Sequence, residues 1–155
     1  MASVILAMAI AAITMPFTAG AQNQQADGSR TLAVDLAQEL MEEIMSKPFQ
    51  DPQGASQLGP ESGETSRAKF DNIDDYNNYT EAAGQIASWD GQVITDPAAA
   101  DLSRRVTCTY VYVAGQDTGQ PPSFIKVKVD VLRKNTPIVT LTRLAYCLHQ
   151  QGRTS

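Results

Sequence analysis

The sequence has little of the chemistry that catalysis and crosslinking need. It contains one histidine and two cysteines in 155 residues, and it carries no GxSxG, HExxH, Walker or dinucleotide-binding pattern. Cys108 and Cys147 make neither a disulfide framework nor a metal site of recognised spacing. Cys147 and His149 share one face of an expected strand, but no other group converges on them, so we do not expect a nucleophile and its base. The sequence therefore predicts no enzyme.

Charge is absent from the first 26 residues, and no lysine or arginine occurs before Arg30. The basic n-region that normally opens a secretory signal is therefore missing. An apolar helix over the first 19 residues would be roughly 28 Å long, close to the roughly 30 Å hydrocarbon core of a bilayer. We therefore expect a membrane-anchor helix over residues 1–21, kinked at a proline. Its apolar and kink residues are Val4, Ile5, Leu6, Met8, Ile10, Ile13, Pro16 and Phe17.

An alternative reading of this segment stays open. Ala19-Gly20-Ala21 resembles a signal-peptidase site with cleavage before Gln22. On that reading the chain is a secreted soluble binding module, released after Ala21, whose loop captures calcium or a small ligand.

The net charge of -5 and the sequence pI of about 4.7 argue against nucleic-acid binding. The two halves of the chain carry opposite charge. From Gln22 to Leu102 there are 15 acidic and 4 basic residues, whereas Ser103 to Ser155 has 2 acidic and 8 basic. We expect the halves, or neighbouring copies of the chain, to face one another.

Two periodicities predict an α+β fold. Apolar residues at four-residue spacing predict an amphipathic stem helix over residues 22–47, which ends before Pro48. Alternating runs after residue 103 predict three antiparallel strands over residues 104–155, with one dry face. The helix stripe is the long apolar surface that can cover this face. The expected helix and sheet core residues are Leu32, Leu36, Leu40, Ile44, Val127 and Val129.

Residues 48–103 are acidic and rich in glycine, proline, aspartate and asparagine, so we expect a wrapped segment with short elements. Ile73, Tyr76, Tyr79 and Trp89 are its expected docking points on the core. The stretch "FDNIDDYNNY" concentrates oxygen ligands, and Asp71, Asp74 and Asp75 could contribute to a calcium site. Aspartate and asparagine also favour capped turns, and this second reading is preferred.

The arrangement resembles the type IV pilin superfamily, especially the minor pseudopilins of bacterial type II secretion systems. "VILAMAIAAITMPF" is similar to the interior of the pilin N-terminal helix, and "LAVDLAQELMEEIMSKPF" resembles the stem of pseudopilin-like proteins. "ESGETSRAKFDNIDDYNNY" is similar to a loop of a subgroup of such proteins. The family's basic leader and its Gly-Phe-Thr-Leu-Ile-Glu motif, where a prepilin peptidase cuts and methylates, do not occur. Met1 resembles a residue just beyond that motif.

The resemblance implies a structural subunit of a pilin-like filament, either a type II secretion pseudopilus or a type IV pilus, that assembles through its N-terminal helix. It implies no cofactor and no catalysed reaction. It implies a single-pass protein of the bacterial inner membrane with its C-terminal domain in the periplasm. The expected partners are other pilin-like or pseudopilin subunits and the inner-membrane assembly machinery.

Overall fold

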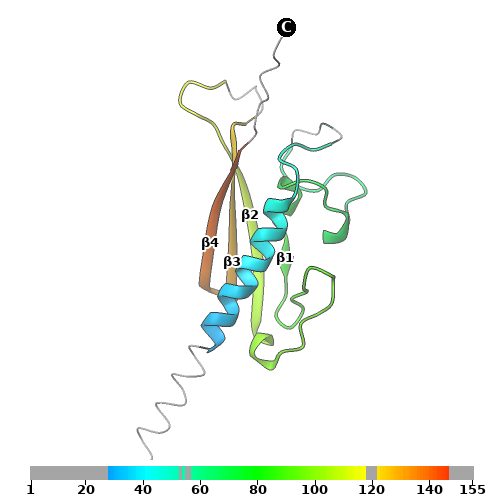
Figure 1. Cartoon of the computed structure of the whole chain (residues 1–155), viewed down its shortest axis with the longest axis vertical. Helices are drawn as coiled ribbons and strands as arrows, with labels where there is room; N and C mark the ends of the chain where they lie inside the picture. The colour runs from blue at the N-terminus through cyan, green and yellow to red at the C-terminus, as the bar shows by residue number, and fades with distance from the viewer. Residues whose placement is uncertain (1–27, 53, 55–56, 118–121, 147–155) are drawn as a thin grey trace, which may run out of the picture.

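The computed structural model describes residues 28–52, 54, 57–117 and 122–146. In this part of the chain one α-helix, over residues 28–46, lies across one face of an antiparallel sheet (Figure 1). Along the sequence, three short 3₁₀ helices and the first strand come after the helix and before the three long strands. The elements are η1 (Arg67–Lys69), η2 (Asp74–Tyr76), β1 (Thr80–Glu81), η3 (Pro97–Ala99), β2 (Leu102–Val111), β3 (Phe124–Arg133) and β4 (Thr136–Tyr146).

The sheet has four strands in the order β1-β2-β3-β4, and every neighbouring pair is antiparallel. A two-residue turn joins β3 to β4, with positive φ angles of 49° at Lys134 and 64° at Asn135. Positive φ at both central residues defines the type I′ turn, whose twist suits a hairpin. This turn sets the pairing of Arg133 with Thr136. A register shift between Val131 and Leu132 then sets which face each residue of β4 from Val139 onward occupies.

The helix and the sheet share one hydrophobic core. Leu36, Leu40 and Ile44 are buried on the helix, Leu32 is partly buried, and Val127 and Val129 are buried on β3. The helix ends at residue 46, where the N–H of Lys47 donates to the carbonyl of Ile44 at 3.1 Å before Pro48. The four-residue spacing thus brings one stripe of the helix onto the alternate residues of the central strand.

The segment between the helix and β2 packs on this core through aromatic residues. Phe70, Tyr76 and Tyr79 meet edge to face, with ring centroids 5.0 to 6.1 Å apart. Ile73 and Tyr76 are buried and Tyr79 is partly buried, as docking points would be. Trp89 differs, because its side chain is 79% exposed.

The expectation of a long N-terminal helix that is both anchor and stem is wrong for the described fold. The helix of residues 28–46 is amphipathic, with Asp35, Glu39 and Glu42 outside its apolar stripe, and it is not a long apolar anchor. The fold is also richer in sheet than expected, since β1 adds a fourth strand and β2 to β4 contain 10, 10 and 11 residues. Two residues are too few for alternation to reveal β1 in the sequence.

The expected single-pass location in the inner membrane is likewise corrected. Among the residues that the structure describes, no helix has the length and apolar character needed to cross a bilayer. The physical reason is the acidic residues of the helix of residues 28–46, which leave it apolar on one stripe alone. The anchor residues expected between Val4 and Phe17 lie outside the described part of the chain.

Candidate functional site

A buried network of two arginines and two glutamates connects the helix, the acidic segment and the sheet. Arg67 donates from Nε to Glu43 Oε1 at 2.8 Å and from Nη1 to Glu81 Oε1 at 3.0 Å. Arg104 pairs with the second oxygen of Glu81 and donates from Nη1 to the carbonyl of Leu36 at 3.0 Å. The Arg104 side chain is fully buried and that of Glu81 is 4% exposed. One carboxylate of β1 is therefore shared by two arginines from different elements.

The contacts of this network keep Glu43 charged and the neighbouring Tyr79 neutral. Burial acts to raise the pKa of Glu43, but hydrogen bonds from Arg67 and Tyr76 outweigh it and the pKa is lowered. Burial, followed by the nearby Glu81, raises the pKa of Tyr79 to about 12. Both shifts move the pKa away from neutral pH, which is opposite to what a general acid or base needs. The network is a structural clamp that fixes the acidic segment to the helix and sheet.

Cys108 is a buried thiol on β2. Its Sγ lies 3.5 Å from the carbonyl oxygen of Ile73, and burial raises its pKa to about 12. A thiol in this state is a poor nucleophile. Cys147 and His149 lie outside the described residues.

The three aspartates that the sequence grouped as calcium ligands have different hydrogen-bond partners in the structure. The hydroxyl of Tyr110 donates to Asp74 Oδ2 at 3.1 Å. Asp75 Oδ2 accepts the backbone N–H groups of Asp71 and Asn72 at 2.8 and 3.0 Å, as in a capped turn. Among the described residues, the acidic cluster able to hold a metal consists of Asp75 with Glu61 and Glu64. The sequence reasoning missed these glutamates, although "ESGE" places two carboxylates three residues apart across a glycine turn.

The outer face of the sheet, away from the helix, is basic and partly apolar. Strand register places Arg105, Lys126 and Lys128 on this face. Asp130 also lies on this face and is buried. Its Oδ2 forms ion pairs with Arg105 Nη2 at 3.3 Å and with Lys128 Nζ at 2.9 Å. Lys126 has no acidic partner at ion-pair distance among the described residues, and its charge faces solvent.

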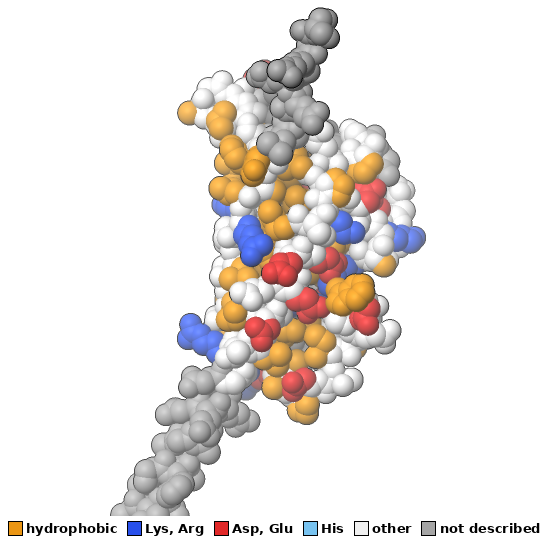
Figure 2. Space-filling view, viewed as in Figure 1, with side chains coloured by type: hydrophobic (Ala, Val, Ile, Leu, Met, Phe, Trp, Pro, Cys, Tyr) orange, Lys and Arg blue, Asp and Glu red, His pale blue; other side chains and the backbone are white. Residues whose placement is uncertain are grey.

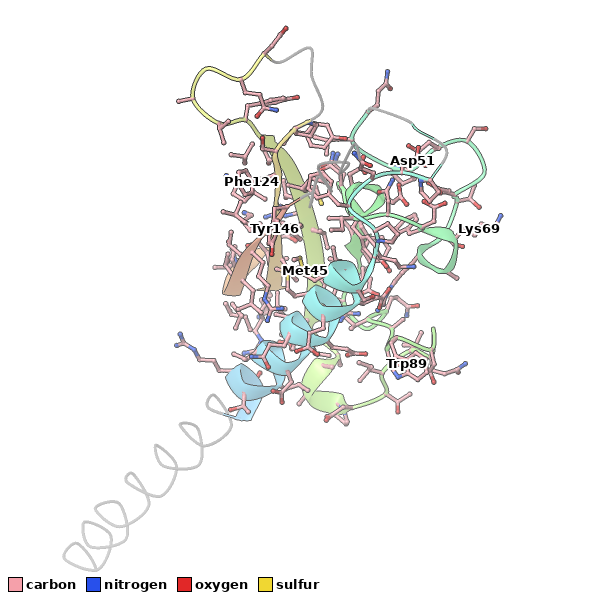
Figure 3. All side chains as sticks on the ribbon, turned by 45° about the horizontal axis from the view of Figure 1, so that its top comes forward. Met45, Asp51, Lys69, Trp89, Phe124 and Tyr146 are labelled. Carbon is pink, nitrogen blue, oxygen red and sulfur yellow. The ribbon has the colours of Figure 1, made fainter. Side chains whose placement is uncertain are left out.

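Apolar side chains follow at one end of the same face. Tyr146 pairs with Phe124 and Leu144 pairs with Lys126 across the β3–β4 ladder, which puts all four on the outer face. Leu144 is 56% exposed and Tyr146 is 60% exposed. Figure 3 labels Phe124 and Tyr146 at this end of the sheet, well apart from Trp89. We call Arg105, Lys126, Lys128, Phe124, Leu144 and Tyr146 the basic sheet face.

The opposite side of the molecule, over the helix, is acidic. Figure 2 shows acidic side chains gathered along the helix, and Asp35, Glu39 and Glu42 are exposed or partly exposed there. Trp89 stands beside them, because its backbone N–H donates to Glu39 Oε1 at 2.9 Å. A tight turn presents its ring, and Asp90 Oδ1 accepts the N–H of Gln92 at 3.1 Å within that turn. We call Asp35, Glu39, Glu42, Trp89 and Asp90 the acidic helix face.

No protein-family model, curated protein or solved structure matches this chain. The geometry of the described residues is therefore the ground for a functional proposal. The described residues form one α+β fold that the buried ion-pair network holds together, with an acidic helix face on one side and a basic sheet face on the other.

Proposed function

We propose that the protein is a non-catalytic structural subunit of a pilin-like filament, a type II secretion pseudopilus or a type IV pilus. In this proposal copies stack with the acidic helix face of one against the basic sheet face of the next. The observation that carries the proposal is the separation of opposite charges onto two faces of one α+β fold. Two different faces that fit each other make a head-to-tail contact, which extends into a filament unless it closes into a ring.

The two faces have the composition that a protein interface needs. Each joins charged residues with exposed apolar side chains, Trp89 on one and Leu144 and Tyr146 on the other. Tryptophan and tyrosine are enriched among the residues that contribute most to binding, while complementary charge sets orientation and encounter rate. The sequence resemblance to pilin-like subunits supports the same function independently of the charges.

Charge reversal on the basic sheet face tests the proposal. The full-length chain with Lys126→Glu and Lys128→Glu is compared with wild type for self-association, by pull-down of differently tagged copies and by sedimentation. We expect association at least tenfold weaker, which corresponds to about 1.4 kcal/mol. Wild-type association should also weaken as salt is raised, because charges farther apart than about 10 Å are screened at 0.1 M salt.

Lys134→Glu is the matched control, since Lys134 is exposed at the hairpin tip and outside both faces. It changes the net charge in the same direction and should leave association unchanged. Equal loss in the control would assign the effect to net charge, and unchanged association in the double variant would refute the stacking. Circular dichroism checks that each variant is folded.

The alternative, a binding module released after Ala21, gives a different result in the same preparation. N-terminal sequencing of the mature protein would begin at Gln22, and the protein would stay monomeric at all concentrations. That pair of results would replace the filament proposal.

A further inference from the structure

Three carboxylates from two separate turns converge beside η2. Glu61, Glu64 and Asp75 each bring one oxygen to within 4.8 Å of the others. The first turn is built locally: the N–H of Glu61 donates to Glu64 Oε2 at 2.9 Å, and the N–H of Glu64 donates to the carbonyl of Glu61 at 3.1 Å. Gly63 has a φ of 112° there, which an L-residue rarely adopts. The backbone thus holds both glutamates against Asp75.

The buried carboxylate of Asp75, which has one oxygen without a hydrogen-bond partner, points to a ligand. Its side chain is 0% exposed, and its Oδ2 accepts two backbone N–H groups. Its Oδ1 is buried and has no hydrogen-bond donor. A buried carboxylate oxygen without a partner is costly, and a bound cation would satisfy it. Because Oδ2 is occupied by the backbone, Oδ1 is the oxygen available to the two glutamates.

The cluster carries several negative charges close together, which a bound cation would neutralise. Glu61 lies near the carboxylates of Glu64 and Asp75, and Asp51 adds a further negative charge. Lys69, the nearby basic residue, donates to the carbonyl of Gly63 at 3.1 Å.

We propose that Glu61, Glu64 and Asp75 bind a divalent cation of the calcium type. The donor set consists of carboxylate oxygens, which hard cations prefer, and contains no sulfur or imidazole ligand. Calcium accepts six to eight oxygens in flexible geometry, so bidentate carboxylates, backbone carbonyls and waters can complete the shell. The site would fasten the turn of residues 61–64 to the buried end of η2. It does not depend on the stacking of the charged faces.

Calcium binding to the full-length chain tests the site directly. After chelator treatment and desalting, calcium chloride is titrated by isothermal calorimetry and its effect on the thermal midpoint is measured. We expect saturable binding of one ion and a rise in the midpoint of several degrees. Glu61→Gln and Glu64→Gln, singly, should each weaken calcium binding at least tenfold, and they spare the buried Asp75, whose replacement endangers folding.

Glu42→Gln is the matched control, because it removes an exposed acidic group on the helix and should bind calcium as wild type does. Magnesium chloride in place of calcium should bind at least tenfold more weakly. The proposal is overturned if no binding occurs up to millimolar calcium, or if both glutamine variants bind as wild type does. Equal affinity for magnesium would overturn the assignment to calcium.

Discussion

Replacing Glu81 by glutamine should destabilise the fold strongly, because Glu81 is the anion that Arg104 and Arg67 share. The change keeps the shape of the side chain, and one oxygen can still accept from Tyr79. It removes the negative charge, so the fully buried Arg104 loses its carboxylate partner, whereas Arg67 keeps Glu43. Removing one partner of a buried ion pair costs about 3–5 kcal/mol.

Urea unfolding of the full-length chain measures this loss. With an m-value of about 2 kcal/mol/M, a loss of about 4 kcal/mol lowers the midpoint by about 2 M. Glu42→Gln, which removes an exposed carboxylate from the same protein, should change the free energy of unfolding by less than about 0.5 kcal/mol. A cost below about 1 kcal/mol for Glu81→Gln would refute the clamp.

A double-mutant cycle assigns the loss to the pair. If Arg104 and Glu81 act together, the variant with both Arg104→Met and Glu81→Gln should lose less stability than the sum of the two single variants. Additive losses would mean that the two residues stabilise the fold separately.

Three further predictions concern groups elsewhere in the fold. Burial raises the pKa of Asp74 to about 6, although Tyr110 donates to it, so its contribution to stability falls as pH rises from about 4 to 6. Asp74→Asn removes this pH dependence. The free energy of unfolding of the variant, measured in urea, should therefore increase relative to that of wild type between pH 4 and pH 7.5. Lys134→Asn should raise the free energy of unfolding by about 0.5 kcal/mol and the thermal midpoint slightly, because asparagine tolerates the positive φ of a type I′ turn better than lysine. A lower midpoint would count against the turn assignment. In a Cys147→Ser background, Cys108 should resist alkylation at pH 8 until the protein is denatured, since burial raises its pKa to about 12, and rapid labelling of the native protein would contradict its burial.

Periodicity was sufficient to predict the layers of this fold. The stripe from Leu32 to Ile44 and the alternation through Val127 and Val129 each identify a buried face from neighbouring residues alone. Both patterns are set by residues that are near one another in the chain, so the buried faces can be predicted from a single sequence. The apolar anchor was predicted over residues 1–21, which lie outside the described part, and the described helix of residues 28–46 is not a long apolar anchor.

Contacts between distant residues could not be predicted in this way. Arg104 meets Leu36, which is 68 positions away in sequence, and nothing in the alternation of β2 marks an arginine as buried. Trp89 was expected as a docking point on the core, but its backbone N–H donates to Glu39 and its ring is exposed. Glu61 and Glu64 meet Asp75 only through the fold of the loop. Such partners become visible when the chain is folded, because side chains that satisfy one another need not be near in sequence.

The most direct test of the filament proposal is a charge exchange between two copies. One full-length variant carries Lys126→Glu and Lys128→Glu, and the other carries Asp35→Lys and Glu42→Lys on the helix. Each variant alone has two faces of like charge and should not self-associate, whereas a mixture should, because each reversed face then meets its complement. Recovery of association in the mixture, measured by sedimentation, is the predicted result. Self-association of either variant alone, or a mixture that stays monomeric when wild type assembles, would contradict the stacking of the acidic helix face on the basic sheet face.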